Sequence, residues 1–83
     1  MNQEQRATEF AVFCIENTAA RLHCTGFEVF QALQQTDGIR DFLFPSYPAL
    51  HTQGKEYIVD EVLEYIGQHN PTFAETYRKE EQP

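Results

Sequence analysis

The sequence predicts an all-α protein, a compact bundle of four to five short helices. Two long stretches carry apolar residues at the spacing of one helix face, and no stretch shows the alternating pattern of a half-buried strand. Glycine and proline fall between the helical stretches, where they mark turns. Because 83 residues suffice for one domain with a modest core, we expect a single helical domain over residues 1–83.

The first helix is expected over residues 4–24, which lack glycine and proline. At about 100° per residue, seven residues share one broad face: Phe10, Ala11, Cys14, Ile15, Thr18, Ala19 and Leu22. The opposite face is polar except for Phe13. Phe13 therefore packs on a neighbouring element or contacts a partner or a second copy of the chain.

A second helix is predicted to begin at Thr25, because Thr25 and Glu28 have the spacing of a capping box. It should end near Thr36, since Asp37-Gly38 is a strong turn signal. Its expected core residues are Val29, Phe30 and Leu33.

Residues 39–43 predict a short helical segment that Pro45 stops, because a proline disfavours helical dihedral angles in the residue before it. A small strand over residues 42–44 is the alternative, since so short an apolar run has no decisive period. Residues 44–52 are expected to be irregular, apart from one turn around Ala49.

The clearest helix begins at Lys55 and should end by Gly67. Its apolar arc contains Ile58, Val59, Val62, Leu63 and Ile66, and its acidic arc contains Glu56, Asp60, Glu61 and Glu64. After it, Asn70-Pro71 is typical of a helix start, and Phe73 with Tyr77 would form an i,i+4 pair in a short fifth helix.

Charge and composition narrow the class of partner. Thirteen acidic against six basic residues give a net charge of −7, which argues against direct contact with nucleic acid or an anionic membrane and favours a basic protein partner. There is no run of eighteen apolar residues and no secretory signal, so a cytoplasmic location is expected. Cys14 and Cys24 are interpreted as reduced thiols.

The stretch from Leu50 to Ile66, with its Leu-His-Thr-x-Gly-x-Glu-Tyr-Ile-Val motif, resembles a small bacterial domain family of unknown function. Phe13-Cys14-Ile15-Glu16 and Thr25-Gly26 match it as well, so the resemblance covers residues 8–66 and leaves residues 67–83 as a C-terminal extension. Members are often encoded beside proteins of ADP-ribosyltransferase-like toxin type. The resemblance therefore implies an accessory or antitoxin-like role.

His51 is the one residue of this motif with the chemistry of a base, a metal ligand or a pH switch. We expect it instead to cap exposed amides or to hold the loop to the domain through its ring nitrogens. No nucleophile motif accompanies it, so we expect no enzyme activity and no cofactor. Cys14 and Cys24 are about 15 Å apart on a helix, and His23, Cys24 and His51 are loosely spaced, so no metal site is expected.

The sequence thus favours a protein-protein interaction module. The acidic arc has almost no balancing cations nearby in the sequence, and we expect it to form one partner-binding side with the loop before it. The residues assigned to this surface are Tyr47, His51, Glu56, Asp60, Glu61 and Glu64, with Phe13 as a further contact. A homodimeric structural adaptor that associates through Phe13 is the alternative, followed by a His51-dependent enzyme or a metal-binding protein.

Overall fold

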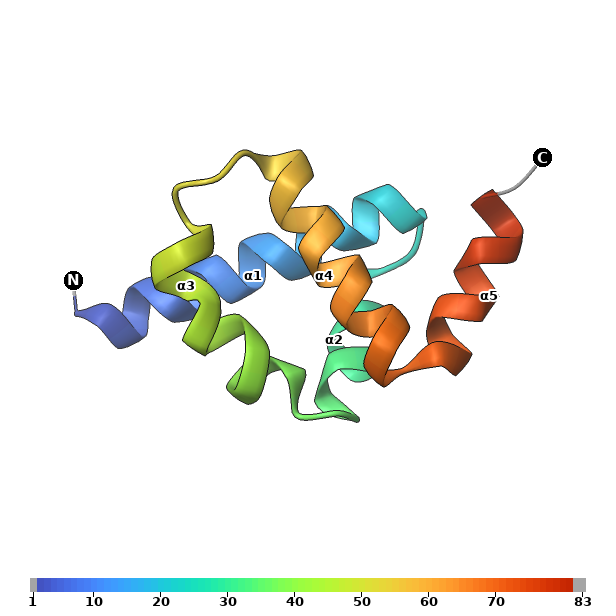
Figure 1. The fold of residues 1–83 in the computed structure, drawn as a ribbon, viewed down its shortest axis with the longest axis horizontal. Coiled ribbons are helices and arrows are strands. Elements are labelled where there is room, and N and C mark those ends of the chain that lie inside the picture. Colours follow the sequence, from blue (N-terminus) through green and yellow to red (C-terminus); the bar gives the residue numbers. More distant parts are fainter. Residues whose placement is uncertain (1, 82–83) are drawn as a thin grey trace.

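The computed structural model describes residues 2–81, and the predicted all-α fold is confirmed over this range (Figure 1). The elements are α1 (Gln3–Leu22), α2 (Gly26–Gln34), the π-helix η1 (Ile39–Leu43), α3 (Phe44–Leu50), α4 (Lys55–His69) and α5 (Pro71–Glu81). The alternative strand over residues 42–44 is wrong, because these residues are helical. Residues 1, 82 and 83 of the predicted domain lie outside the described range.

Helix α1 runs through the middle of the molecule, and α2, η1, α3 and α4 pack against it. It begins where the Asn2 side chain accepts a hydrogen bond from the amide of Gln5 at 2.8 Å. It ends at Leu22, because His23 adopts a left-handed conformation with φ of 58°. All seven residues of the predicted apolar face are buried, which confirms that face.

The capping box at the start of α2 is also confirmed. The amide of Glu28 donates to the Thr25 hydroxyl at 3.1 Å, and the amide of Thr25 donates to the Glu28 carboxylate at 2.8 Å. Val29 and Leu33 are fully buried, but Phe30 is 39 % exposed, so its assignment to the core is wrong. Phe30 follows Val29 by about 100° around the helix, and Ala32 takes the inward position instead.

A tight turn joins α2 to η1 at the predicted place. Asp37 adopts a left-handed conformation with φ of 56°, and Gly38 after it is buried. A Cβ atom on Gly38 would lie only 2.7 Å from Cε1 of Tyr65 in α4. Tyr65 donates its hydroxyl to the Thr36 carbonyl at 3.1 Å and stacks on Phe42. Gly38 is therefore required for the close approach of this tyrosine, which ties α4 to the turn.

Residues 44–52 were expected to be irregular, and this prediction is wrong because α3 covers most of the segment. Phe44 keeps helical dihedral angles, and its amide bonds to the Ile39 carbonyl five residues back. The backbone thus widens into a π-turn directly before Pro45. Pro45 then stands in the first turn of α3, where a missing N–H costs little, and Pro48 lies within the helix.

Helices α4 and α5 meet at Asn70. Helix α4 ends at His69, two residues beyond the expected end at Gly67. The Asn70 amide group donates to the Ala32 carbonyl of α2 at 3.1 Å, and its oxygen accepts from the amide of Phe73 at 3.4 Å. The predicted fifth helix is confirmed, as is its aromatic pair, because the rings of Phe73 and Tyr77 lie 4.8 Å apart.

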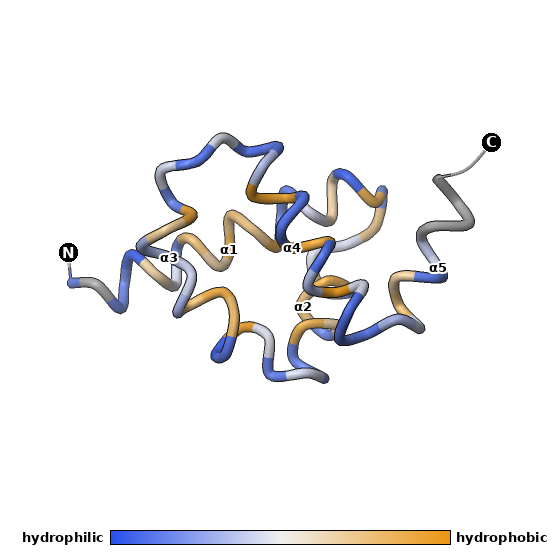
Figure 2. The backbone as a smooth tube through the Cα atoms, in the orientation of Figure 1, coloured by the Kyte–Doolittle hydropathy of each residue, from blue (hydrophilic) through white to orange (hydrophobic). Residues whose placement is uncertain are grey.

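The hydrophobic core lies where α1, α2 and α4 face one another, and the apolar positions of these helices gather there (Figure 2). The largest fully buried side chains are Leu33, Leu43, Ile66, Val29, Val62, Thr18 and Cys14. Outside this core, the connection from α3 to α4 is hydrophilic along most of its length (Figure 2). The core therefore leaves the loop that carries His51 at the surface.

Candidate functional site

A shallow groove lies between α1, the C-terminal half of α3 and the start of α4. We call it the aromatic groove; its volume is about 320 Å³. It is lined by Arg6, Glu9, Phe10, Phe13, Tyr47, His51, Gln53 and Ile58. The structure thus brings together three of the predicted site residues, since Phe13 of α1 lies near Tyr47 and His51, which are more than thirty residues further along the chain.

The aromatic rings that line the groove fix one another's orientation by direct contact. Tyr47 packs edge-on against Phe10, with ring centroids 5.5 Å apart, and stacks on His51 at 4.4 Å. The amide of His51 donates to the Tyr47 carbonyl at 3.0 Å, so the last turn of α3 places the two rings one above the other. Among the described side chains and the backbone of residues 2–81, no hydrogen bond to the His51 ring is present, and its ring contact is the stack on Tyr47. The expected capping role is therefore wrong, and stacking orients the ring instead.

Phe13 forms part of the rim of the groove and stays 40 % exposed. Arg6 and Glu9 bring one charge of each sign to the same groove, and sequence reasoning did not assign either of them to a site. The spacing of Arg6 and Phe13, seven residues apart on one helix, indicates that they share a face. That signal was present, but only the packing of α3 on α1 shows that this face borders a groove.

The acidic arc of α4 is less uniform than its sequence indicates. Arg21 of α1 lies 3.0 Å from a carboxylate oxygen of Glu56 and 3.0 Å from one of Asp60. The hydrogen bond to Asp60 is the largest of several effects that raise the pKa of Arg21. The expected lack of balancing cations is therefore wrong for these two carboxylates, which hold α4 to the C-terminal end of α1.

The other two acidic residues of α4 have no basic partner among the side chains that the structure describes, those of residues 2 and 4–77. Glu64 is exposed and accepts a hydrogen bond from Gln68 at 3.5 Å, while Glu61 is half-buried. Relative to the described cations, these two carboxylates, and not the whole arc, carry the uncompensated negative charge of the α4 surface.

The aromatic groove and the ion pairs of Arg21 lie on opposite flanks of α4. Ile58 lines the groove, whereas Asp60, two residues later, contacts Arg21. Two residues correspond to about 200° around a helix. The structure therefore does not join Glu56 and Asp60 to Tyr47 and His51 in one continuous side.

The remaining reactive groups are scattered or protected. Among the side chains that the structure describes, no group of three or more from His, Cys, Asp and Glu is placed to hold a metal ion, so His23, Cys24 and His51 are not gathered. Burial raises the pKa of the Cys14 thiol to about 12, which keeps it protonated and inert near neutral pH. No helix in this part of the chain combines the length and apolar character needed to cross a membrane.

The chain matches the model of a family described as "Protein of unknown function (DUF3791)" over residues 9–69. This range runs from α1 to the last residue of α4 and contains Phe13, Tyr47, His51 and the acidic arc. No curated protein and no solved structure is significantly similar to the chain. Because the match covers well over half of the 83 residues, the chain belongs to the DUF3791 family of proteins of unknown function.

Proposed function

We propose that this protein is a small interaction module that binds a protein partner at the aromatic groove. The observation that supports this most strongly is the exposure of Phe13 beside the stacked rings of Tyr47 and His51. Aromatic side chains held by rigid helices lose little entropy on binding and are enriched among the residues that dominate interface energies. The groove is also shallow, which suits a protruding side chain of a partner better than an enclosed substrate.

The partner that fits this surface is basic. The chain carries a net charge of −7, and Glu61 and Glu64 are not neutralised by the described cations. Long-range attraction of this kind accelerates encounter and weakens with salt. We further propose that the partner is toxin-like and that this chain accompanies or neutralises it; the support for this step is the family resemblance of the Leu50–Ile66 stretch.

Co-purification with the product of the adjacent gene, followed by calorimetric titration, tests the proposal. Phe13→Ala should weaken binding by at least about tenfold, because truncating an interface hot spot costs about 2 kcal/mol or more. Phe27→Ala is the matched control, since Phe27 is 65 % exposed on α2 and does not line the groove. Equal affinities for the two variants would exclude the groove as the binding surface.

Charge-reversal variants test the contribution of the acidic α4 surface to partner binding separately from that of the groove. Glu61→Lys and Glu64→Lys should slow association and reduce its salt dependence, because both remove negative charge without disturbing Arg21. Asp60→Lys is a poor choice, since it also breaks an ion pair between α1 and α4. An unchanged salt dependence would show that the α4 surface takes no part in binding.

The same exposed Phe13 supports a second candidate function, that of a homodimeric adaptor. Association is a common way for so short a chain to gain stability. The mass of the wild type and of Phe13→Ala in solution decides between the two. A dimer that dissociates in Phe13→Ala favours the adaptor, whereas a monomeric wild type contradicts it.

A further inference from the structure

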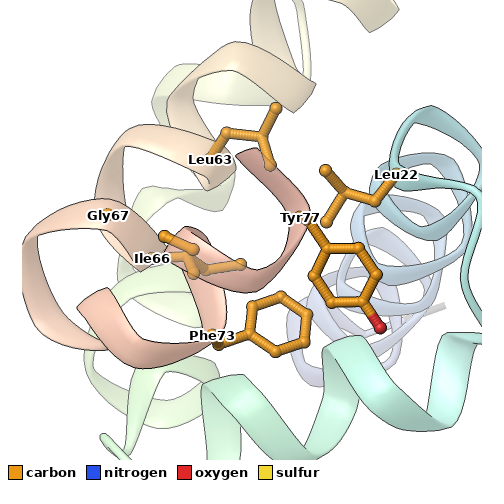
Figure 3. Close-up of a pocket in the computed structure, with 7 residues that line it drawn as sticks. Leu22, Leu63, Ile66, Gly67, Phe73 and Tyr77 are labelled. Carbon is orange, nitrogen blue, oxygen red and sulfur yellow. The ribbon is translucent and has the colours of Figure 1, made fainter. Parts of the chain in front are cut away.

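A second hollow lies at the other end of the molecule, where α5 packs over α4 and the last turn of α1 (Figure 3). Its volume is about 140 Å³. It is lined by Leu22, Leu63, Ile66, Gly67, Phe73, Ala74 and Tyr77. We call it the α5 cavity. It shares no residue with the aromatic groove, and three of its lining residues lie beyond the family match.

The side chains that line the α5 cavity are almost entirely hydrocarbon. The only polar side-chain atom among its lining residues is the Tyr77 hydroxyl, which points away from the labelled apolar side chains (Figure 3). This hydroxyl lies beside Cys24 and Glu28, and burial, the largest of several effects, raises the pKa of Tyr77 to about 12.

Gly67 is the one lining residue without a side chain. It lies within α4, where alanine would form a more stable helix, and a Cβ atom added to it would meet nothing within 4 Å. Neither a left-handed backbone nor a close contact therefore explains a glycine at this position. Open space therefore adjoins Gly67, which is one of the residues that line the cavity.

We propose that the α5 cavity is a binding site for a small apolar molecule of about the size of a six-membered hydrocarbon ring. An engineered apolar cavity of about 150 Å³ binds benzene, so the volume is sufficient. Leu22, Leu63 and Ile66 supply aliphatic walls, and Phe73 and Tyr77 supply ring faces. This site is independent of the proposed protein partner.

Titration with benzene, followed by NMR, tests the site. We expect saturable shifts of the methyl signals of Leu22, Leu63 and Ile66, with a Kd on the order of 1 mM, since six heavy atoms give limited affinity. Pyrimidine has the same shape but two ring nitrogens that would lose their hydrogen bonds to water, and it should bind at least about tenfold more weakly. Equal binding of the two rings, or no saturable shift with benzene, would overturn the proposal.

Two variants that fill the α5 cavity test whether benzene binds there. Gly67→Leu and Ala74→Leu each place a branched side chain at the cavity wall and should weaken benzene binding at least about tenfold. Ala20→Leu adds the same side chain at an exposed position of α1 and should leave benzene binding unchanged. Circular dichroism identifies the variants that fold, and either filling variant alone suffices. Undiminished binding in a folded filling variant would contradict the assigned site.

Discussion

Replacement of Thr18 by valine should stabilise the protein. Thr18 lies in α1, is fully buried, and its hydroxyl oxygen has no hydrogen-bond partner among the described residues. Valine has nearly the same shape and helix propensity but carries a methyl group in place of the hydroxyl. The substitution therefore changes one thing, which is the presence of an unpaired polar group in the core.

The expected gain can be worked out from the burial of Thr18. Leaving a buried hydroxyl unsatisfied costs about 1–3 kcal/mol, and burying a methyl group contributes about 0.8 kcal/mol. Allowing for imperfect fit of the new methyl group, we expect Thr18→Val to raise the free energy of unfolding by about 1–2 kcal/mol. In a domain of this size, each 1 kcal/mol raises Tm by about 4–8 °C.

Urea denaturation followed by circular dichroism measures the change, with two matched controls. Thr8→Val alters an exposed threonine of the same helix, whose hydroxyl donates to the Glu4 carbonyl at 2.9 Å, and should change stability by less than about 0.5 kcal/mol. Thr18→Ser keeps the unpaired hydroxyl but loses a methyl group, and should destabilise by about 1 kcal/mol. A loss of stability in Thr18→Val would show that the hydroxyl is satisfied in solution and would refute the reasoning.

Further outcomes are expected at two glycines, at the cap of α2 and at Cys14. Gly67→Ala should stabilise the protein by about 1 kcal/mol in thermal unfolding, because the new methyl group meets open space, whereas Gly38→Ala should destabilise it because its Cβ would lie 2.7 Å from Tyr65. Thr25→Ala should lower the unfolding free energy by about 1 kcal/mol through loss of the cap, and an unchanged urea midpoint would contradict this. The Cys14 thiol should react with a disulfide reagent at pH 8 only when urea unfolds the chain. Since its folded pKa of about 12 exceeds the unfolded value near 9, its contribution to stability should be lost as pH rises from about 9 to 12, and Cys14→Ala should reduce that loss.

Local signals in the sequence predicted the helices well where the structure of an element depends only on interactions between residues close together in the chain. The apolar face of α1 and the capping box of α2 depend on residues within one or two turns of each other, and both are confirmed. The turn at Asp37-Gly38 was located correctly too. The need for glycine there was not predictable, because it arises from Tyr65, which lies 27 residues further along the chain.

Prediction failed where the outcome depends on contacts between elements. Pro45 was expected to end a helix, yet a π-turn before it lets α3 continue along α1. Phe30 has a large apolar side chain typical of a core residue. The angle at which α2 meets its neighbours nevertheless leaves it exposed. In both cases a weak local preference was outweighed by the packing of the whole helix.

For the candidate sites too, local sequence signals predicted some features, whereas others depend on contacts between helices. The sequence by itself determined the all-α fold, the family and the surface position of an aromatic such as Phe13, because these follow from periodicity and motif. Only the tertiary structure decided that Phe13 shares a groove with Tyr47 and His51, that Arg21 neutralises part of the acidic arc, and that α5 covers one side of a cavity. The physical reason is that helix periodicity specifies which face of a helix is buried, whereas the position of one helix against another depends on the shapes of all the side chains between them.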